Sequence, residues 1–413
     1  MGGAAAALAG SPHDVAAMNS VILDISRLVS RLRYATPSGV DRVEMAYVRG
    51  LLAHYGEALD FSAVHPAGRY GRVPRQAALA FLDRLEARWA DADDQPVRLS
   101  LPAIVPQLAA LWPRRVPPAR PGAVYVQVSP HHLTRAGTMR RILDREQARF
   151  ACMVHDLIPI EFPEYARPSG GALHRRRIET VAALADTVIV NSAATGRSLQ
   201  PWLDRSGRAV DVAVALLGTV PMVPAIPDPG DGRPYFVCLG TIEPRKNHLL
   251  LLHLWRQLAE TLPDHAVPRL VVVGRRGWEN EQIVDMLERC PALEHHVTEI
   301  GSCPDARLSS LLRGARALLM PSFAEGYGMP VAEALSVGTP VICSELAALR
   351  EVGGAVPDYL DPLDGPGWRA AVLDHAAGGP MALAQRARLP HWHNPSWAEH
   401  MAIAIAAIER TRR

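Results

Sequence analysis

Two glutamates stand eight positions apart around a glycine-rich turn in the segment 321–335. Apolar runs precede and follow this segment, so the pattern indicates strand, loop, helix and strand, with Pro330 in the first helical turn and Gly338 at the helix end. Glu325 would lie on the loop and Glu333 one turn into the helix, whose amino end offers free N–H groups to an anion. Carboxylates accept hydrogen bonds from hydroxyls. The segment therefore predicts a site for a ligand with phosphates and hydroxyls, such as a nucleotide sugar. A plain structural turn is the alternative.

Two adjacent cations, Arg245 and Lys246, follow a strand-like run at 235–239 and a glycine, Gly240. The dipole at the amino end of a helix disfavours positive charge, so this placement makes sense if a diphosphate lies between the cations and the helix. Arginine would supply a two-pronged clamp and lysine a point charge. A solvated basic turn is the alternative. Gly274, in a glycine turn after another strand-like run, would let the backbone approach the same ligand.

The first half of the chain offers further candidates. His155 ends a strand-like run, where it would face a cleft and grip a sugar hydroxyl, and Asp156 could orient its ring. A structural histidine is the alternative. In the first loop, Gly39 could let the backbone approach phosphates, and Arg42 could add charge. A simple helix cap formed by Ser38 or Thr36 is the alternative there.

Short apolar strand-like runs alternate with helical patterns along most of the chain. Such alternation is typical of parallel sheets. Two series separated by a Pro/Gly-dense stretch predict an α/β protein with two Rossmann-like, doubly wound parallel-sheet domains facing a central cleft. The expected strands are 21–26, 59–64, 124–129, 150–155, 187–191, 210–217, 235–239, 270–273, 297–300, 317–320 and 341–343. The expected helices are 40–54, 74–90, 246–262, 280–289, 306–312, 330–337 and 397–410.

The expected boundaries follow from this alternation. They are a disordered tail at 1–18, a first, acceptor-side domain at 19–218, a linker at 219–234, a nucleotide-sugar-binding domain at 235–393, and a terminal helix at 394–413 that could cross back to the first domain. The Arg/Pro-rich stretch at 66–122 carries no motif that assigns it a role.

Bulk properties narrow the class of protein. A length of 413 residues favours two domains, and a net charge of +2 gives no reason to expect nucleic acid as a partner. The five cysteines show neither metal-ligand spacing nor a disulfide framework, which favours a reducing compartment, the cytoplasm. No apolar run is long enough to span a bilayer, and the Ala/Gly-rich start lacks the positive charge of an export signal. The sequence contains no nucleophile elbow, P-loop or HExxH motif.

With these residues in place, the chain resembles the retaining glycosyltransferases of GT-B fold, family four. The resemblance covers most of residues 150–345. The residues that carry it are the E-x7-E pair Glu325 and Glu333, the turn Gly240…Arg245-Lys246-Asn247, and His155-Asp156. The sequence of residues 240–247 is similar to that of the corresponding segment in mannosyltransferases and related enzymes of bacterial O-antigen and exopolysaccharide assembly.

The resemblance implies a role for each matching position. Arg245 and Lys246 would stabilise the departing diphosphate. Glu325 would bind hydroxyls of the donor sugar, Glu333 would bind the ribose of the nucleotide, and His155 would contact the sugar from the first domain. The implied catalytic residues are His155, Arg245, Lys246 and Glu325. The implied donor-binding residues are Gly39, Gly240, Gly274, Gly326, Tyr327, Gly328, Met329 and Glu333.

The resemblance also implies an activity: transfer of a hexose, with mannose favoured, from a nucleotide sugar to a glycan or lipid-linked oligosaccharide. The implied donor is GDP-mannose, with a UDP-sugar as the alternative, and neither a cofactor nor a metal is expected. A lipid-linked acceptor would bring the enzyme to the inner face of the membrane. Three other interpretations stay open: a nucleotide-sugar epimerase, a catalytically silent GT-B scaffold subunit, and a two-domain NAD-binding protein. The absence of G-x-G-x-x-G after the first strand disfavours the last of these.

Overall fold

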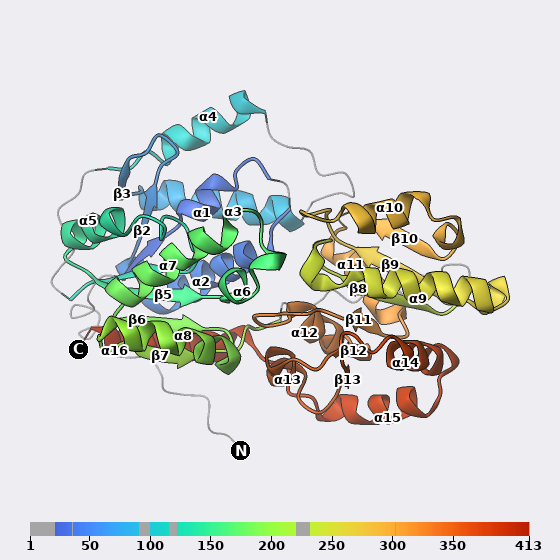
Figure 1. The fold of residues 1–413 in the computed structure, drawn as a ribbon. Coiled ribbons are helices and arrows are strands. Elements are labelled where there is room, and N and C mark those ends of the chain that lie inside the picture. Colours follow the sequence, from blue (N-terminus) through green and yellow to red (C-terminus); the bar gives the residue numbers. More distant parts are fainter. Residues whose placement is uncertain are drawn as a thin grey trace, which may run out of the picture.

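The computed structural model describes residues 21–34, 36–90, 100–114, 122–219, 232–301 and 303–412. Within this part, the chain forms two α/β domains that lie side by side, each built on one sheet (Figure 1). The tail expected at 1–18 and most of the linker expected at 219–234 lie outside the described residues.

The first domain is built on a seven-stranded sheet in the order β3-β2-β1-β4-β5-β6-β7. Its strands are parallel except β3, which runs antiparallel to β2. They are β1 (Val21–Asp24), β2 (Leu59–Val64), β3 (Tyr70–Arg72), β4 (Val124–Gln127), β5 (Arg149–Val154), β6 (Thr187–Val190) and β7 (Asp211–Val214). Strands β1, β4 and β6 are buried along their whole length, as apolar runs covered on both faces should be. The short Tyr-Gly-Arg run of β3 has no apolar alternation, and the sequence analysis did not place it.

Helices pack against both faces of this sheet, because its strands alternate between two hydrophobic clusters. They are α1 (Ser26–Ser30), α2 (Gly39–Tyr55), α3 (Arg75–Ala90), α4 (Leu101–Ala110), α5 (Ala136–Glu146), α6 (Ile158–Glu161), α7 (Gly170–Leu184) and α8 (Ala193–Ser206), with 3-10 turns at η2 (Gly56–Ala58) and η3 (Pro163–Tyr165). Helix α2 begins at a capping box between Ser38 and Asp41, in which each side chain accepts a hydrogen bond from the other residue's N–H. The cap interpretation of this loop is therefore confirmed for Ser38.

The second domain is built on a six-stranded parallel sheet in the order β10-β9-β8-β11-β12-β13. The strands are β8 (Tyr235–Leu239), β9 (Arg269–Val273), β10 (Val297–Ile300), β11 (Leu318–Met320), β12 (Val341–Ser344) and β13 (Asp358–Leu360). The helices are η4 (Pro244–Lys246), α9 (His248–Thr261), η5 (Asp264–Ala266), α10 (Glu281–Arg289), η6 (Pro291–Leu293), α11 (Asp305–Gly314), α12 (Met329–Ser336), α13 (Ala347–Gly353), α14 (Gly365–Ala377), α15 (Pro380–Arg388) and η7 (Leu389–His391). The sequence analysis had assigned no element between 344 and 393.

The last helix, α16 (Trp397–Thr411), crosses back and packs on the first domain against α2, β6 and β7 (Figure 1). Ser396 and Glu399 form a capping box at its start. His400 is buried against α2, with its Nε2 2.9 Å from the Tyr47 hydroxyl. The chain therefore passes between the domains twice, once near residue 219 and once before α16.

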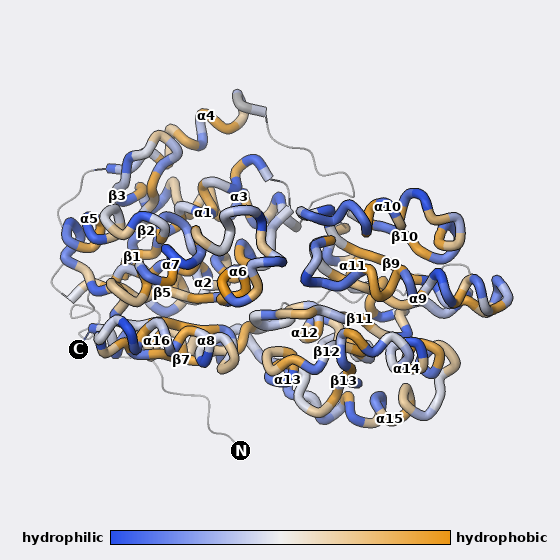
Figure 2. The backbone as a smooth tube through the Cα atoms, viewed as in Figure 1, coloured by the Kyte–Doolittle hydropathy of each residue, from blue (hydrophilic) through white to orange (hydrophobic). Residues whose placement is uncertain are grey.

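Buried apolar side chains follow the strands of both sheets, and Figure 2 shows the most hydrophobic segments at the centres of the two domains. A single hydrophobic cluster contains residues of both domains, including Val21 and Leu23 from β1 and Val331 and Leu335 from α12. The domains thus share packed apolar surface in addition to their linking segments. Among the described residues, no helix combines the length and hydrophobicity needed to cross a membrane.

Candidate functional site

A cavity of about 420 Å³ lies between the two domains, at the carboxyl ends of strands from both sheets. The first domain contributes residues that follow β5, β6 and β7, together with the start of α2. The second domain contributes residues that follow β8, β9, β10 and β11. This is where open α/β sheets bind ligands. Every residue expected from the sequence to be catalytic or donor-binding lines this cavity: Gly39, His155, Gly240, Arg245, Lys246, Gly274, Glu325, Gly326, Tyr327, Gly328, Met329 and Glu333.

Glu325 lies at the centre of a cluster of charges at the floor of the cavity. Its carboxylate accepts a hydrogen bond from Lys246 Nζ at 2.6 Å and lies 2.9 Å from a terminal nitrogen of Arg245. Arg245 also pairs with Glu243 at 2.6 Å through its Nε and donates to the Ala324 carbonyl. The side chains of Glu325 and Lys246 are only 7% and 9% exposed. The cluster therefore fixes the orientation of both cations before any ligand arrives.

The helix that follows the two cations begins at His248, two residues later than expected. Arg245 and Lys246 lie in the 3-10 turn η4, and Asn247, in the left-handed conformation at a φ of 55°, separates them from α9. The cations therefore lie directly before the N-cap residue of the helix, at its amino end, and do not form its first turn.

Gly240 makes room for the lysine. Its φ of 145° lies in the region that residues with a Cβ avoid, and a Cβ at this position would stand 3.2 Å from Lys246 Cε. Lys246 therefore lies across the Gly240 backbone to reach Glu325.

The two cations determine the charge state of Glu325. Burial alone would raise the pKa of its carboxyl group, but the charges of Arg245 and Lys246 outweigh that effect and lower the pKa to about 2. Glu325 is therefore ionised at any physiological pH. An ionised carboxylate accepts hydrogen bonds and donates none, so it can bind hydroxyls of a ligand.

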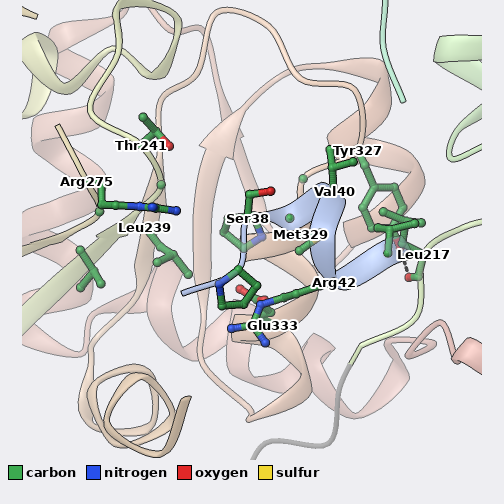
Figure 3. A pocket seen from close by; sticks show the side chains of 18 of the residues that line it. Ser38, Val40, Arg42, Leu217, Leu239, Thr241, Arg275, Tyr327, Met329 and Glu333 are labelled. Atoms are coloured by element: carbon green, nitrogen blue, oxygen red, sulfur yellow. Dashed lines mark hydrogen bonds between the residues drawn. The ribbon is translucent and has the colours of Figure 1, made fainter. Parts of the chain in front are cut away.

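Glu333 lies on α12 with a different environment. No described residue donates a hydrogen bond to its carboxylate, which is largely buried and faces the cavity. Burial raises its pKa to about 7, an effect that Arg42 opposes and Asp305 reinforces. Arg42 forms a two-pronged ion pair with Asp305 of the second domain, at 2.7 and 2.9 Å. Asp305 thus holds the guanidinium of Arg42 close to Glu333 (Figure 3), and the expectation that Arg42 adds charge for phosphates stays a prediction.

His155 lines the cavity from the end of β5, but Asp156 does not orient it. The ring Nε2 lies 2.8 Å from the Val128 carbonyl, and Asp156 instead accepts from the Ile158 N–H at the start of α6. The proposed orienting role of Asp156 is thus wrong, since a backbone carbonyl of β4's following loop holds the ring. Burial lowers the pKa of His155, which favours the neutral ring.

The turn between the two glutamates is pinned to the first domain. The Gly326 carbonyl accepts hydrogen bonds from Ser192 Oγ at 2.8 Å and Thr195 Oγ1 at 3.2 Å. A Cβ at Gly326 would stand 2.5 Å from the His155 carbonyl oxygen, so only glycine fits there. Tyr327 donates to the Leu217 carbonyl across the interface (Figure 3). The turn that carries Glu325 is therefore positioned by both domains.

The amino end of α12 faces the cavity as expected. Gly328 precedes the helix with a φ of 104°, and Pro330 lies in the first turn. In the described part of the chain, the backbone N–H groups of Gly326, Tyr327 and Gly328 donate to no other protein group. Free N–H groups at the start of a helix are suited to an anion.

Several cavity residues were missed by sequence reasoning, chiefly Thr241, Arg275, Asn191 and Asp305. Only one signal was available for Arg275, its place directly after the glycine of a strand-end turn. Asp305 and Asn191 belong to stretches that share the family resemblance, but no site role was assigned to them, because their place at the cavity depends on how the two domains face each other. Within the described residues, no group of acidic, histidine or cysteine side chains is arranged to hold a metal ion.

Comparison with known proteins agrees with this geometry. Residues 224–354 match the family model of group 1 glycosyl transferases. The chain is 39% identical over 132 residues to O-antigen chain mannosyltransferase B of Escherichia coli, covering 32% of this chain and 33% of that protein. It is 30% identical over 173 residues to a phosphatidyl-myo-inositol mannosyltransferase of Mycolicibacterium smegmatis, covering 42% and 40%. The matches thus span well under half of the length of these relatives.

Solved structures resemble the whole chain. Sucrose-phosphate synthase from Thermosynechococcus elongatus aligns with a TM-score of 0.62 at 17% identity, over 95% of this chain and 98% of that one. Anabaena HepE in complex with UDP and glucose aligns with a TM-score of 0.59 at 14% identity, over 95% and 100%. At such identities the likeness concerns the fold, which is the two-domain GT-B arrangement. The family match over residues 224–354 and the GT-B fold together support a GT-B glycosyltransferase of the family 4 type.

Proposed function

We propose that this chain moves a hexose from a nucleotide sugar to a hydroxyl of a glycan or lipid-linked oligosaccharide, with retention of the anomeric configuration. The observation that carries the proposal is the interdomain cavity, in which an ionised, cation-bound Glu325 and an unpartnered Glu333 line the same space. The match to group 1 glycosyl transferases and the mannosyltransferase relatives support it.

The proposed donor pose follows from the charges. The diphosphate would lie near Arg245, Lys246 and the free N–H groups that precede α12. The donor sugar would present hydroxyls to Glu325, and the ribose would present hydroxyls to Glu333. His155 would contact the sugar from the first domain.

The proposed reaction is a displacement on one face of the sugar. The acceptor oxygen forms a bond to the anomeric carbon as the bond from that carbon to the phosphate oxygen breaks, and its electron pair leaves with the nucleoside diphosphate. The proton of the acceptor hydroxyl passes to an oxygen of the departing phosphate. Arg245 and Lys246 would stabilise the charge that develops there, so the protein contributes positioning and electrostatics, and the proposal includes no metal.

The finer assignments rest on the relatives. The similarity to an O-antigen chain mannosyltransferase favours mannose as the sugar and GDP-mannose as the donor. It also favours a role in O-antigen or exopolysaccharide synthesis. A UDP-sugar is the alternative donor, and HepE with bound UDP and glucose has the same fold. We place the reaction in the cytoplasm, at the inner face of the membrane when the acceptor is lipid-linked.

The test has two stages. Thermal unfolding is first followed with GDP, UDP or ADP and without added metal, because a ligand that binds only the folded state raises stability as ln(1 + [L]/Kd). One nucleotide should stabilise the protein clearly, and it names the base. The matching nucleotide sugars are then incubated with the protein and oligosaccharide acceptors. Release of nucleoside diphosphate supports transfer, conversion of the donor without release indicates an epimerase, and binding without turnover indicates a silent scaffold.

A further inference from the structure

The cation cluster at the cavity floor is electrically balanced. Arg245 and Lys246 are paired with two carboxylates, Glu243 and Glu325. The cluster therefore offers hydrogen-bond donors to a phosphate but brings no net positive charge. A nucleoside diphosphate carries at least two negative charges, and a cavity without a compensating cation would bind it poorly.

The other charged residues of the cavity lining do not fill this gap, with one exception. Arg42 is held by Asp305, and Asp156 and Glu333 are acidic. Among the described residues that line the cavity, Arg275 is the one cation with no carboxylate partner. Its side chain is exposed and, in Figure 3, extends into the cavity beside Thr241.

The backbone of Arg275 is fixed although its side chain is free. Its carbonyl accepts from the Ile242 N–H at 2.9 Å, and Gly274 donates to the Ile300 carbonyl at 2.9 Å. A Cβ at Gly274 would stand 1.8 Å from the Gly240 carbonyl oxygen, so the turns after β8 and β9 are in direct contact. The root of the Arg275 side chain is therefore held next to the turn that carries Lys246.

The neighbouring arginine shows the contrast. Arg276 pairs with Glu299 at 2.7 Å and with Glu288 at 2.5 Å, and it does not line the cavity. Two adjacent arginines thus have opposite roles: one is neutralised on the surface and the other is left unpaired at the cavity.

We propose that Arg275 binds the diphosphate of the donor and supplies the net positive charge that the balanced Arg245–Lys246 cluster lacks. This inference rests on the proposed function, since it assigns a ligand group within the same cavity. Arg275 thereby selects ligands by their phosphate charge rather than by their base or ribose.

The experiment measures calorimetric binding of a nucleoside, its monophosphate and its diphosphate, using the base that stabilises the wild type. The variants are Arg275→Gln and, as a matched control, Arg276→Gln. Arg275→Gln should weaken diphosphate binding about tenfold or more, change nucleoside binding less than about twofold, and reduce the salt dependence of diphosphate binding. Arg276→Gln should bind all three ligands like the wild type. Because Arg275 is exposed and unpaired, its variant should unfold at the wild-type temperature.

Three results would overturn the inference. If Arg275→Gln binds the diphosphate within about twofold of the wild type, the inference about Arg275 is refuted and the proposed function is unaffected. Equal weakening of diphosphate and nucleoside would assign Arg275 to the base or ribose instead. If the wild type binds no nucleoside diphosphate, the proposed function fails and this inference fails with it.

Discussion

Glu325 and Glu333 are the same residue type, eight positions apart, and line the same cavity. The pKa values of their carboxyl groups are nevertheless shifted in opposite directions. Glu325 contacts two cations and its pKa falls to about 2, whereas burial raises the pKa of Glu333 to about 7. The difference comes from the partners and not from the depth of burial, because both groups lose water. Glu325 forms ion pairs that stabilise the surrounding turn, whereas the carboxylate of Glu333 has no such partner among the described residues and can bind a ligand.

Removing the charge of Glu325 should have the largest effect. Glu325→Gln leaves Arg245 and Lys246 with one carboxylate between them in a largely buried site, so we expect a loss of about 3–5 kcal/mol in the free energy of unfolding. Denaturant titration at pH 7 measures it. The double variant Glu325→Gln/Lys246→Met restores the charge balance and should recover part of this loss. A single variant as stable as the wild type would contradict the structural role of Glu325.

Gly326→Ala changes the turn between the two glutamates. The added methyl group would stand 2.5 Å from the His155 carbonyl oxygen, so the turn and the first domain must move apart. We expect turnover to fall about a hundredfold, because a shift of about 1 Å misplaces Glu325 relative to the donor. Gly365→Ala, at a glycine of the same domain with no positive φ and no neighbour within 4 Å, is the control for the effect of an added methyl group. Equal turnover of the wild type and Gly326→Ala would show that the turn tolerates displacement.

Glu333→Gln should reveal that the pKa of the second carboxyl group is raised, whereas that of Glu325 is lowered. Its folded-state pKa lies near 7, above the ordinary value of 4.5, so the wild type loses stability as pH rises between these values. The variant has no carboxyl group to ionise, and its stability relative to the wild type should increase by about 3 kcal/mol from pH 4.5 to pH 8. Nucleotide binding should weaken at the same time. Parallel stability curves of the two proteins would rule out a raised pKa.

The smallest effects come from the ion pair beside Glu333. Arg42 lowers the pKa of Glu333 and Asp305 raises it, so Arg42→Gln should move that pKa up and Asp305→Asn should move it down. The pair is partly exposed, and we expect each variant to change the free energy of unfolding by less than about 1 kcal/mol. The pH dependence of nucleotide binding reports the two shifts. Shifts in the same direction for both variants would contradict the assigned charges.

Local patterns in the sequence predict much of this structure. The strands around the cavity have continuous apolar runs, and the cap at Ser38 and the start of α12 at Pro330 depend on a few neighbouring residues. The E-x7-E spacing therefore places both glutamates correctly on loop and helix.

Contacts between distant segments lie beyond such patterns. The pairing of Arg42 with Asp305 joins residues 263 positions apart, and Val128, not the adjacent Asp156, holds the His155 ring. The helix after Arg245 and Lys246 was expected two residues too early, because a left-handed Asn247 has no reliable signal in a helix-like run. The partners of a buried charged side chain, and the charge state that results, can be predicted only when the three-dimensional arrangement is known.

The most direct test of the account is a crystal structure of the chain with the nucleoside diphosphate that stabilises it. The account predicts that the phosphates contact Lys246 and Arg275 and that both ribose hydroxyls lie within hydrogen-bonding distance of the Glu333 carboxylate. A nucleotide bound outside the interdomain cavity, or bound within it with the ribose away from Glu333, would contradict the account.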